Sequence, residues 1–330
     1  MDLSAQLVGA GLLQSVLYLL FIRGIDLYER EPLRYVLPVF IWGFAVATTI
    51  SLIFNTLFTF TLATITQDMQ IANFFTAVVA APVIEECAKG LALLIVFVVS
   101  YVATRQRGVI EFAGVMDGIV YGSAVGFGFA IAEDILYGLQ FGPDIFVMRR
   151  VFGGFAHAAF ASMTGIGIGL IPYVRYRALR PVPPVLGLLA AIALHATFNF
   201  TATLFGGLAY VILFFVVLGY LLTIVVWLAI ERRAIRTELR GEVADGTITP
   251  EEYAIIPTYF RRTGYYLRLI LSGKLGTWLA ARKLHAVAVD LAISKLLLRR
   301  SYSLAREARV SALRRELLDS RRQLTPRMGV

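Results

Sequence analysis

One short stretch decides the fold class of this chain: Pro82-Val83-Ile84-Glu85-Glu86-Cys87-Ala88-Lys89-Gly90, residues 82–90. It lies in the middle of an apolar run that is long enough to cross a bilayer as a helix. A charged side chain at membrane depth costs about 2.5–3.5 kcal/mol on insertion scales, so an ionisable residue there indicates a functional site. Other apolar runs carry four more polar residues, namely Glu133, His157, His195 and Asn199. The pattern predicts a buried polar site inside a helical membrane protein.

Composition supports a membrane protein. The chain has 330 residues and is 58% hydrophobic, whereas soluble domains are about 45–50% apolar. The excess lies in the first 230 residues, as long runs that only helices carry across lipid. We therefore predict an all-α fold, a polytopic integral membrane helical bundle with about seven transmembrane helices, at residues 5–22, 35–60, 73–102, 114–137, 149–174, 183–204 and 207–230.

Charge divides the chain into two predicted domains. Residues 1–230 hold 11 basic and 12 acidic residues, a net charge of −1, whereas residues 231–330 hold 20 basic and 10 acidic residues, a net charge of +10. We expect a transmembrane domain over 1–230 and a basic, helical cytoplasmic tail over 231–330, with anionic lipid as a partner of the tail. No nucleic-acid-binding module accompanies the charge, so nucleic acid is not an expected partner.

The tail contains local helix signals. Thr249-Pro250-Glu251-Glu252 is typical of a helix start, with Thr249 as N-cap and Glu252 completing a capping box. Residues 279–323 are rich in Ala, Leu and Arg and predict one or two amphipathic helices. His285 lies in this basic region and is expected at the surface.

Loop charges predict the orientation. Arginines occupy the loops at 23–34, 103–110 and 175–180 and the start of the tail, whereas the alternate loops near 61–72 and 203–208 contain no Lys or Arg. The positive-inside rule then places the N-terminus outside and the C-terminus in the cytoplasm of a multi-pass cell-membrane protein. The exception is Arg149-Arg150 at the outer end of the fifth span. Either the rule is locally broken there, or one of the pair serves the site.

The five polar residues converge in depth. Counted from the outer end of each span at about 1.5 Å per residue, Glu85 lies roughly 18 Å deep, His157 and His195 roughly 12 Å, and Glu133 and Asn199 roughly 6 Å. Helical spacing adds to this agreement, because Lys89 follows Glu86 by three residues and Glu85 by four, so either carboxylate can reach it. We infer one shared site in the outer half of the bilayer.

These side chains suit activation of water. A buried carboxylate acts as a general base, imidazoles polarise a carbonyl or stabilise an oxyanion, and Asn199 is a neutral donor. The same Glu and His residues, with Glu133, His157 and His195 as the expected ligands, suit a divalent metal such as zinc that generates the hydroxide. No cofactor beyond this metal is expected.

For some of these residues a purely structural role remains open. Asp117 and Asp134 would only satisfy neighbouring groups, and Cys87 is a weak candidate for a nucleophile. The same polar cluster would also fit a proton relay in an ion-coupled transporter, although no repeated half or pair of broken helices is visible. A third alternative is a non-catalytic membrane scaffold.

These motifs, in this order, resemble the PrsW family of intramembrane proteases within the superfamily of CAAX prenyl endopeptidases and bacteriocin-processing proteins. Its Glu-Glu-x-x-Lys motif is matched by Glu85, Glu86 and Lys89, and its Phe-x-x-x-Glu motif by Phe129 and Glu133. His157 matches a histidine of the next helix, and His-x-x-x-Asn is matched by His195 and Asn199. The resemblance covers roughly residues 20–230, including Tyr28-Glu29-Arg30-Glu31-Pro32, and departs at Asp134, where Asn is more usual.

The resemblance implies a peptidase that cleaves membrane-anchored proteins, anti-sigma factors among them, at an extracytoplasmic position. By analogy with the prenyl endopeptidases, Glu85 would be the general base and Glu86 would support it or exchange roles with it. His157 and His195 would orient water and stabilise the oxyanion. Asn199 and Glu133 would complete the polar ring, and Lys89 would balance the carboxylates.

Overall fold

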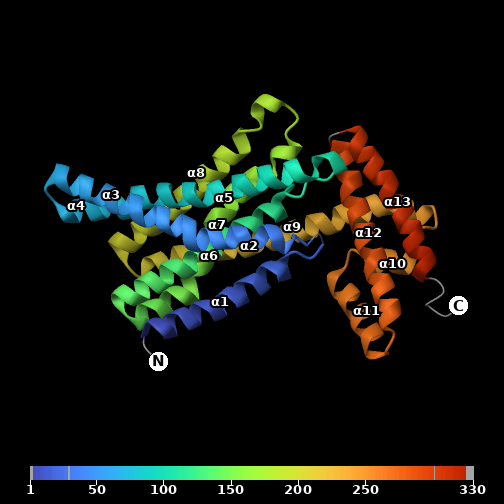
Figure 1. The fold of residues 1–330 in the computed structure, drawn as a ribbon, viewed down its shortest axis with the longest axis horizontal. Coiled ribbons are helices and arrows are strands. Elements are labelled where there is room, and N and C mark those ends of the chain that lie inside the picture. Colours follow the sequence, from blue (N-terminus) through green and yellow to red (C-terminus); the bar gives the residue numbers. More distant parts are fainter. Residues whose placement is uncertain (1–2, 29, 301, 325–330) are drawn as a thin grey trace. The chain divides into compact units, whose positions relative to one another are not determined.

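Helices make up all the regular structure in the part of the chain that the computed structural model describes, residues 3–28, 30–300 and 302–324 (Figure 1). Glu29 of the resemblance lies outside these residues. By length and composition, seven helical segments of the described chain are able to cross a membrane, which confirms the predicted polytopic all-α fold. They are Leu3–Ile25, Leu33–Thr66, Met69–Arg107, Val115–Phe141, Gly153–Tyr173, Arg177–Phe205 and Leu208–Ala244.

The chain forms two compact units. The first, here called the membrane unit, comprises Met1–Asp26, Glu31–Ser100 and Glu111–Ile224. The second, called the tail unit, comprises Val225–Val330 together with two short segments between membrane helices, Leu27–Arg30 and Tyr101–Ile110.

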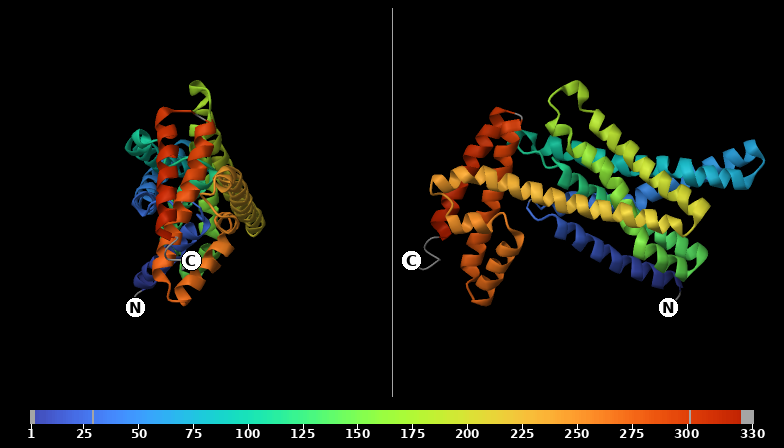
Figure 2. Two further views of the ribbon diagram at one scale, coloured as in Figure 1. Left: turned by 90° about the vertical axis from the view of Figure 1, so that its right-hand side faces the viewer. Right: turned by 180° about the vertical axis from the view of Figure 1, so that it is seen from behind.

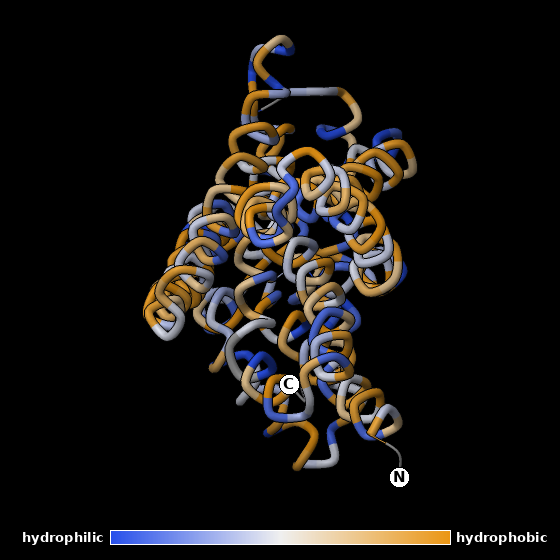
Figure 3. The backbone as a smooth tube through the Cα atoms, turned by 90° about the vertical axis from the view of Figure 1, so that its left-hand side faces the viewer, coloured by the Kyte–Doolittle hydropathy of each residue, from blue (hydrophilic) through white to orange (hydrophobic). Residues whose placement is uncertain are grey.

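Several spans of the membrane unit are built from more than one element. Its helices are α1 (Leu3–Ile25), α2 (Leu33–Ile41), α3 (Thr48–Thr66), α4 (Met69–Phe75), α5 (Ala81–Thr104), α6 (Val115–Phe141), α7 (Pro143–Gly169), α8 (Val182–Phe205) and the first part of α9 (Leu208–Ala244). Helices α3 and α4 pack side by side as a hairpin (Figures 1 and 2). Figure 3 shows hydrophobic residues running along these helices, as membrane helices require.

Helix α6 lies at the centre of the membrane unit. It is buried along almost all of its apolar window, because α1, α2 and α7 pack around it (Figure 1). Glycines make the contact with α7 close: a Cβ on Gly126 would lie 2.4 Å from the carbonyl oxygen of His157, and one on Gly122 would lie 2.5 Å from the Cα of Ser162. The main chain that carries His157 is therefore held directly against α6.

Two π-helical turns interrupt the long spans. One, η1 (Trp42–Ala47), joins α2 to α3, and the other, η2 (Thr76–Ala80), joins α4 to α5. The first begins four residues after Pro38, whose ring and missing N–H disturb the α-helical bonding pattern. The hydroxyl of Thr48 donates to the carbonyl of Gly43 at 3.0 Å. Such turns are frequent at functional sites, and η2 leads straight into the helix that carries Glu85.

The tail unit is a small helical bundle with its own core. It contains the end of α9, then α10 (Pro250–Ile255), α11 (Tyr259–Leu271), α12 (Leu275–Arg300) and α13 (Leu304–Leu324). The predicted capping box at Thr249 and Glu252 is present, and the predicted amphipathic region forms two helices, α12 and α13, that pack together. The core of the tail unit includes Leu239, Ile256, Leu284, Leu291, Leu313 and Leu317.

The prediction that His285 lies at the surface is wrong. Its side chain is buried at 1% exposure, and the Tyr266 hydroxyl lies 2.9 Å from its Nδ1. Burial, with Arg262 and Arg321 nearby, lowers the pKa of His285 to about 3. The imidazole is therefore neutral at physiological pH and packs as a core group. Composition pointed to a basic surface, but position 285 falls on the inward face of α12.

Gly126→Ala tests the close packing of α6 on α7. The added methyl group meets the main chain of His157, so we expect a loss of about 1–3 kcal/mol in the free energy of unfolding, measured by thermal unfolding in detergent. Gly219→Ala on α9 is the matched control, because its Cβ would meet nothing within 4 Å. Equal melting temperatures for the two variants would contradict the close contact.

Candidate functional site

Helix α5 supplies two carboxylates and the cation that faces them. Lys89 Nζ lies 2.8 Å from Glu86 Oε1 and 3.7 Å from Glu85 Oε2. All three side chains are buried, and Lys89 and Glu86 are 0% exposed. The spacing of three and four residues predicted both contacts. Since an uncompensated charge is costly in a membrane, one ammonium group shared by two carboxylates keeps the cluster close to neutral.

His195 on α8 bridges the same two carboxylates. Its Nδ1 lies 2.9 Å from Glu86 Oε1, and its Nε2 lies 3.8 Å from Glu85 Oε2. A carboxylate oxygen only accepts, so Nδ1 carries a proton that it donates to Glu86, and Nε2 lies on the side of Glu85. Glu86 is thus bound by both Lys89 and His195, whereas Glu85 Oε2 is buried without a hydrogen-bond partner. The two carboxylates are in different environments.

His157 on α7 links this cluster to α6. Its Nδ1 lies 3.2 Å from Lys89 Nζ, and its Nε2 lies 2.8 Å from Glu133 Oε2. The ammonium group donates, so Nδ1 accepts and the proton on Nε2 is donated to Glu133. The histidine rings of His157 and His195 are 5.4 Å apart, edge to face. Five of the predicted site residues, together with Lys89, therefore form one connected group.

Arg149 pairs with two neighbouring carboxylates of α6, Glu133 and Asp134. Its Nη2 lies 2.6 Å from Glu133 Oε2, and its Nε lies 3.3 Å from Asp134 Oδ1. Its guanidinium also stacks 4.0 Å from the centre of the Tyr137 ring. Of the two alternatives left open by the sequence, Arg149 takes the second, because it neutralises carboxylates at the edge of the cluster. Asp134 therefore forms an ion pair with Arg149, in agreement with the prediction that it only satisfies a neighbouring group.

Asn199 is directed away from the carboxylates. Its Nδ2 donates to the carbonyl of Ala77 in η2 at 2.8 Å, so Asn199 ties α8 to the π-helical turn that precedes α5. Asp117 accepts from the backbone N–H of Ala113 at the start of α6, a local structural role. Cys87 is exposed on the opposite side of α5 from Lys89's partners.

Two contributors, Phe160 and Asn55, were missed by reasoning from the sequence. Phe129, known from its motif, lies 4.0 Å from Lys89 Nζ as a cation–π partner, but Phe160, which stacks on His195 at 5.1 Å, gave no signal among 23 phenylalanines. Asn55 on α3 lies 3.5 Å from Glu85 Oε1. Asn55 was detectable, since it is an amide in the middle of an apolar span. Arg149 was noticed only as an anomaly.

The donor atoms fit a divalent metal. Glu85, His157 and His195 each offer one ligand atom, and these atoms lie within 4.8 Å of one another. His195 Nε2 and Glu85 Oε2 face each other at 3.8 Å, and a cation between them would bind both atoms. A carboxylate with two imidazoles is a zinc-type donor set. This set has Glu85 where the sequence suggested Glu133, which is bound to Arg149 instead.

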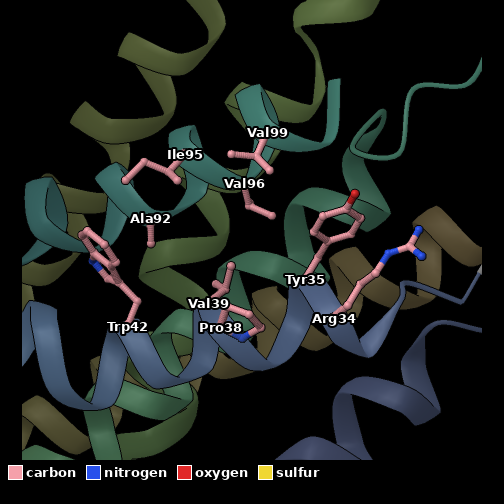
Figure 4. Close-up of a pocket in the computed structure, with 9 residues that line it drawn as sticks. All are labelled: Arg34, Tyr35, Pro38, Val39, Trp42, Ala92, Ile95, Val96 and Val99. Carbon is pink, nitrogen blue, oxygen red and sulfur yellow. The ribbon is translucent and has the colours of Figure 1, made fainter. Parts of the chain in front are cut away.

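An apolar groove of about 220 Å³ lies between α2 and α5 (Figure 4). Arg34 and Tyr35 lie at one end of it and Trp42 at the other, with Ala92, Ile95 and Val99 opposite. Trp42 Nε1 donates to the carbonyl of Ala88 at 3.1 Å, the residue before Lys89. The groove therefore ends beside the turn of α5 that carries the charged cluster.

The profile of the PrsW family intramembrane metalloproteases matches residues 31–230. The chain belongs to this family. The match contains all four helices that contribute to the cluster, and it confirms the resemblance drawn from the motifs.

Individual relatives agree with the family assignment. The chain is 32% identical over 137 residues to Protease PrsW of Shouchella clausii (strain KSM-K16), and 31% identical over 164 residues to that of Geobacillus kaustophilus (strain HTA426). These matches span 41% and 49% of this chain but 60% and 65% of the relatives. Protease PrsW of Bacillus subtilis (strain 168) is 26% identical over 211 residues, 64% of this chain and 89% of the relative. No solved structure matches the chain.

Lys89→Met tests the charge balance of the cluster. Removing the ammonium group leaves two buried carboxylates and a histidine without their shared partner, so we expect a loss of about 3–5 kcal/mol in the free energy of unfolding. The double variant Lys89→Met/Glu86→Gln should recover part of the loss, because a neutral amide needs no counter-charge. Thermal unfolding in detergent measures both, with Lys283→Met on the exposed face of α12 as the control. Full stability of Lys89→Met would contradict this account.

Proposed function

We propose that this protein is an intramembrane endopeptidase that cleaves a membrane-anchored protein substrate. The observation that carries the proposal is the inequality of the two adjacent glutamates. Glu86 is fixed by Lys89 and His195 at 2.8 and 2.9 Å, while Glu85 keeps a buried oxygen without a hydrogen-bond partner that faces Nε2 of His195. One carboxylate is structural and the other is left to react, as water activation requires.

The proposed reaction is hydrolysis of a peptide bond. Glu85 takes a proton from a water molecule oriented by His195, and the water oxygen forms a bond to the scissile carbonyl carbon. Lys89, whose Nζ lies 3.7 Å from Glu85 Oε2, stabilises the negative charge that develops on the carbonyl oxygen. Glu85 then returns the proton to the departing nitrogen as the carbon–nitrogen bond breaks.

We propose Glu85, His157 and His195 as the residues that would hold a divalent metal such as zinc. In the metal-bound form Glu85 would be a ligand, and its role as general base applies to the metal-free site. A bound zinc ion would polarise the scissile carbonyl and lower the pKa of water. Glu133 would orient His157, because its bond to Nε2 at 2.8 Å leaves Nδ1 turned toward the cluster. Arg149 would keep Glu133 in this role by neutralising it. Asn199 would hold η2, and with it the start of α5.

The side of the membrane and the substrate are part of the proposal. The arginines of alternate loops favour an outer N-terminus and a cytoplasmic tail, which puts the cluster in the outer half of the bilayer. A membrane-anchored anti-sigma factor is the substrate class that the family resemblance favours. The groove between α2 and α5 is apolar and ends beside Ala88, so it suits an apolar segment approaching from the lipid.

Glu85→Gln should lower the cleavage rate at least about 100-fold, because the amide cannot accept the proton from water. Substrates are first found by comparing membrane-protein N-termini in cells that express the parent or the variant. The cleavage rate is then measured in liposomes. Glu251→Gln, an exposed residue at the start of α10, is the control and should cleave like the parent. A Glu85→Gln protein that is folded and fully active would overturn the assignment.

Metal analysis by mass spectrometry tests the ligand set. We expect about one equivalent of zinc in the purified protein, lost in His157→Ala and in His195→Ala. The third histidine provides a matched control, since His285→Gln alters a buried ring of the tail unit and should leave the zinc in place. A protein without bound metal would contradict the metal part of the proposal and leave Glu85 and His195 to activate water directly.

A further inference from the structure

Helix α11 of the tail unit has an exposed apolar stripe. Phe260, Leu267 and Leu271 are 85%, 54% and 78% exposed, and their spacing of seven and four residues puts them on one face of the helix. Leu275 and Leu279, both 55% exposed, continue apolar exposure into the first turns of α12. Large side chains gathered this way outside a membrane span indicate an interaction surface.

The stripe is fixed in place by the opposite face of α11. Tyr265 and Leu269 pack on the core of the tail unit, and Tyr266 stacks on the buried ring of His285. The sequence of α11 thus has two apolar faces, of which the core covers only one. Exposure of Phe260 and Leu271 is therefore a property of the folded unit.

Every charged residue of α11, of the turn after it and of the first turns of α12 is positive. Residues 259–283 contain six basic residues and no acidic one. Arg261 and Arg268 are exposed and each follows a residue of the stripe, and Lys274 is exposed in the turn between α11 and α12. Apolar residues bordered by arginine and lysine are the composition of helices that lie in the interface of an anionic membrane.

The start of α11 is tied to a segment that adjoins a membrane span. Arg262 Nη2 donates to the carbonyl of Leu27 at 2.5 Å, and the Tyr28 hydroxyl donates to the carbonyl of Pro257 at 3.0 Å. Leu27 follows the last residue of α1, Ile25, by two positions. Since α1 is a membrane span, these bonds keep the beginning of α11 within a few residues of the bilayer.

We propose that α11 and the first turns of α12 form a membrane-docking surface of the tail unit. Phe260, Leu267 and Leu271 enter the boundary between headgroups and acyl chains, and Arg261, Arg268 and Lys274 contact anionic headgroups. The tether at Leu27 and the one-sided positive charge favour a lipid surface over a protein partner. The inference concerns the tail unit alone and does not depend on the proposed peptidase activity.

Single labelled cysteines test the proposal in the full-length protein. Cys87→Ser removes the native thiol, and Leu271→Cys or Leu304→Cys then carries a fluorophore; Leu304 on α13 is 76% exposed and is the matched control. In liposomes of phosphatidylglycerol with brominated acyl chains, we expect the label at 271 to be quenched at least about threefold more than the label at 304. Thermal unfolding checks that both proteins are folded.

Charge reversal tests whether quenching at position 271 requires contact of the basic residues with anionic headgroups. Adding Arg261→Glu, Arg268→Glu and Lys274→Glu should return quenching at 271 to the level at 304, whereas Arg315→Glu on the exposed side of α13 should not. Replacing phosphatidylglycerol by phosphatidylcholine should weaken quenching at 271. Equal quenching at 271 and 304, or none at 271 with lipid alone, would overturn the proposal; the second result would point to a protein partner.

Discussion

The buried ammonium group of Lys89 is the interaction on which the membrane unit depends. It joins α5 to itself through Glu86 at 2.8 Å and to α7 through His157 at 3.2 Å, while Glu86 in turn binds His195 on α8. In a soluble protein such charges would find water if the helices separated. In lipid, separation of the helices would leave an unpaired charge. The Lys89 ammonium group therefore holds α5, α7 and α8 together, although its own desolvation opposes burial.

The same constraint explains why Arg149 lies beside the cluster. Glu133 accepts from His157 and would otherwise remain a carboxylate with one neutral donor. Arg149 neutralises it at 2.6 Å and reaches Asp134 as well. The cluster therefore has two charge-balanced parts: Lys89 lies between Glu85 and Glu86, and Arg149 lies between Glu133 and Asp134. Hydrogen-bond roles follow from these charges, since they fix which nitrogen of His157 carries the proton.

Sequence reasoning recovered whatever depends on long apolar runs and on short helical spacings. The seven spans follow from hydropathy, and the contacts of Lys89 with Glu85 and Glu86 follow from separations of four and three residues. It failed where the answer depends on packing between distant segments. His285 is buried because α11 lays Tyr266 across it, and Phe160 matters because α7 and α8 meet beside His195. Neither position differs locally from its neighbours.

The close packing of α6 bears on chemistry as well as on stability. A zinc ligand or a proton acceptor must be placed to within about half an ångström, and long helices in lipid have no hydrophobic force to press them together. Gly126 lets the main chain of His157 touch α6, and α6 also carries Glu133 and Phe129, both of which contact the His157 ring. One helix thus fixes the backbone, the tautomer and the tilt of the same imidazole. Gly126 and Glu133 are seven residues apart on one face of α6. Together they position His157 beside Lys89, Gly126 through its close contact with the main chain and Glu133 through its hydrogen bond to the ring.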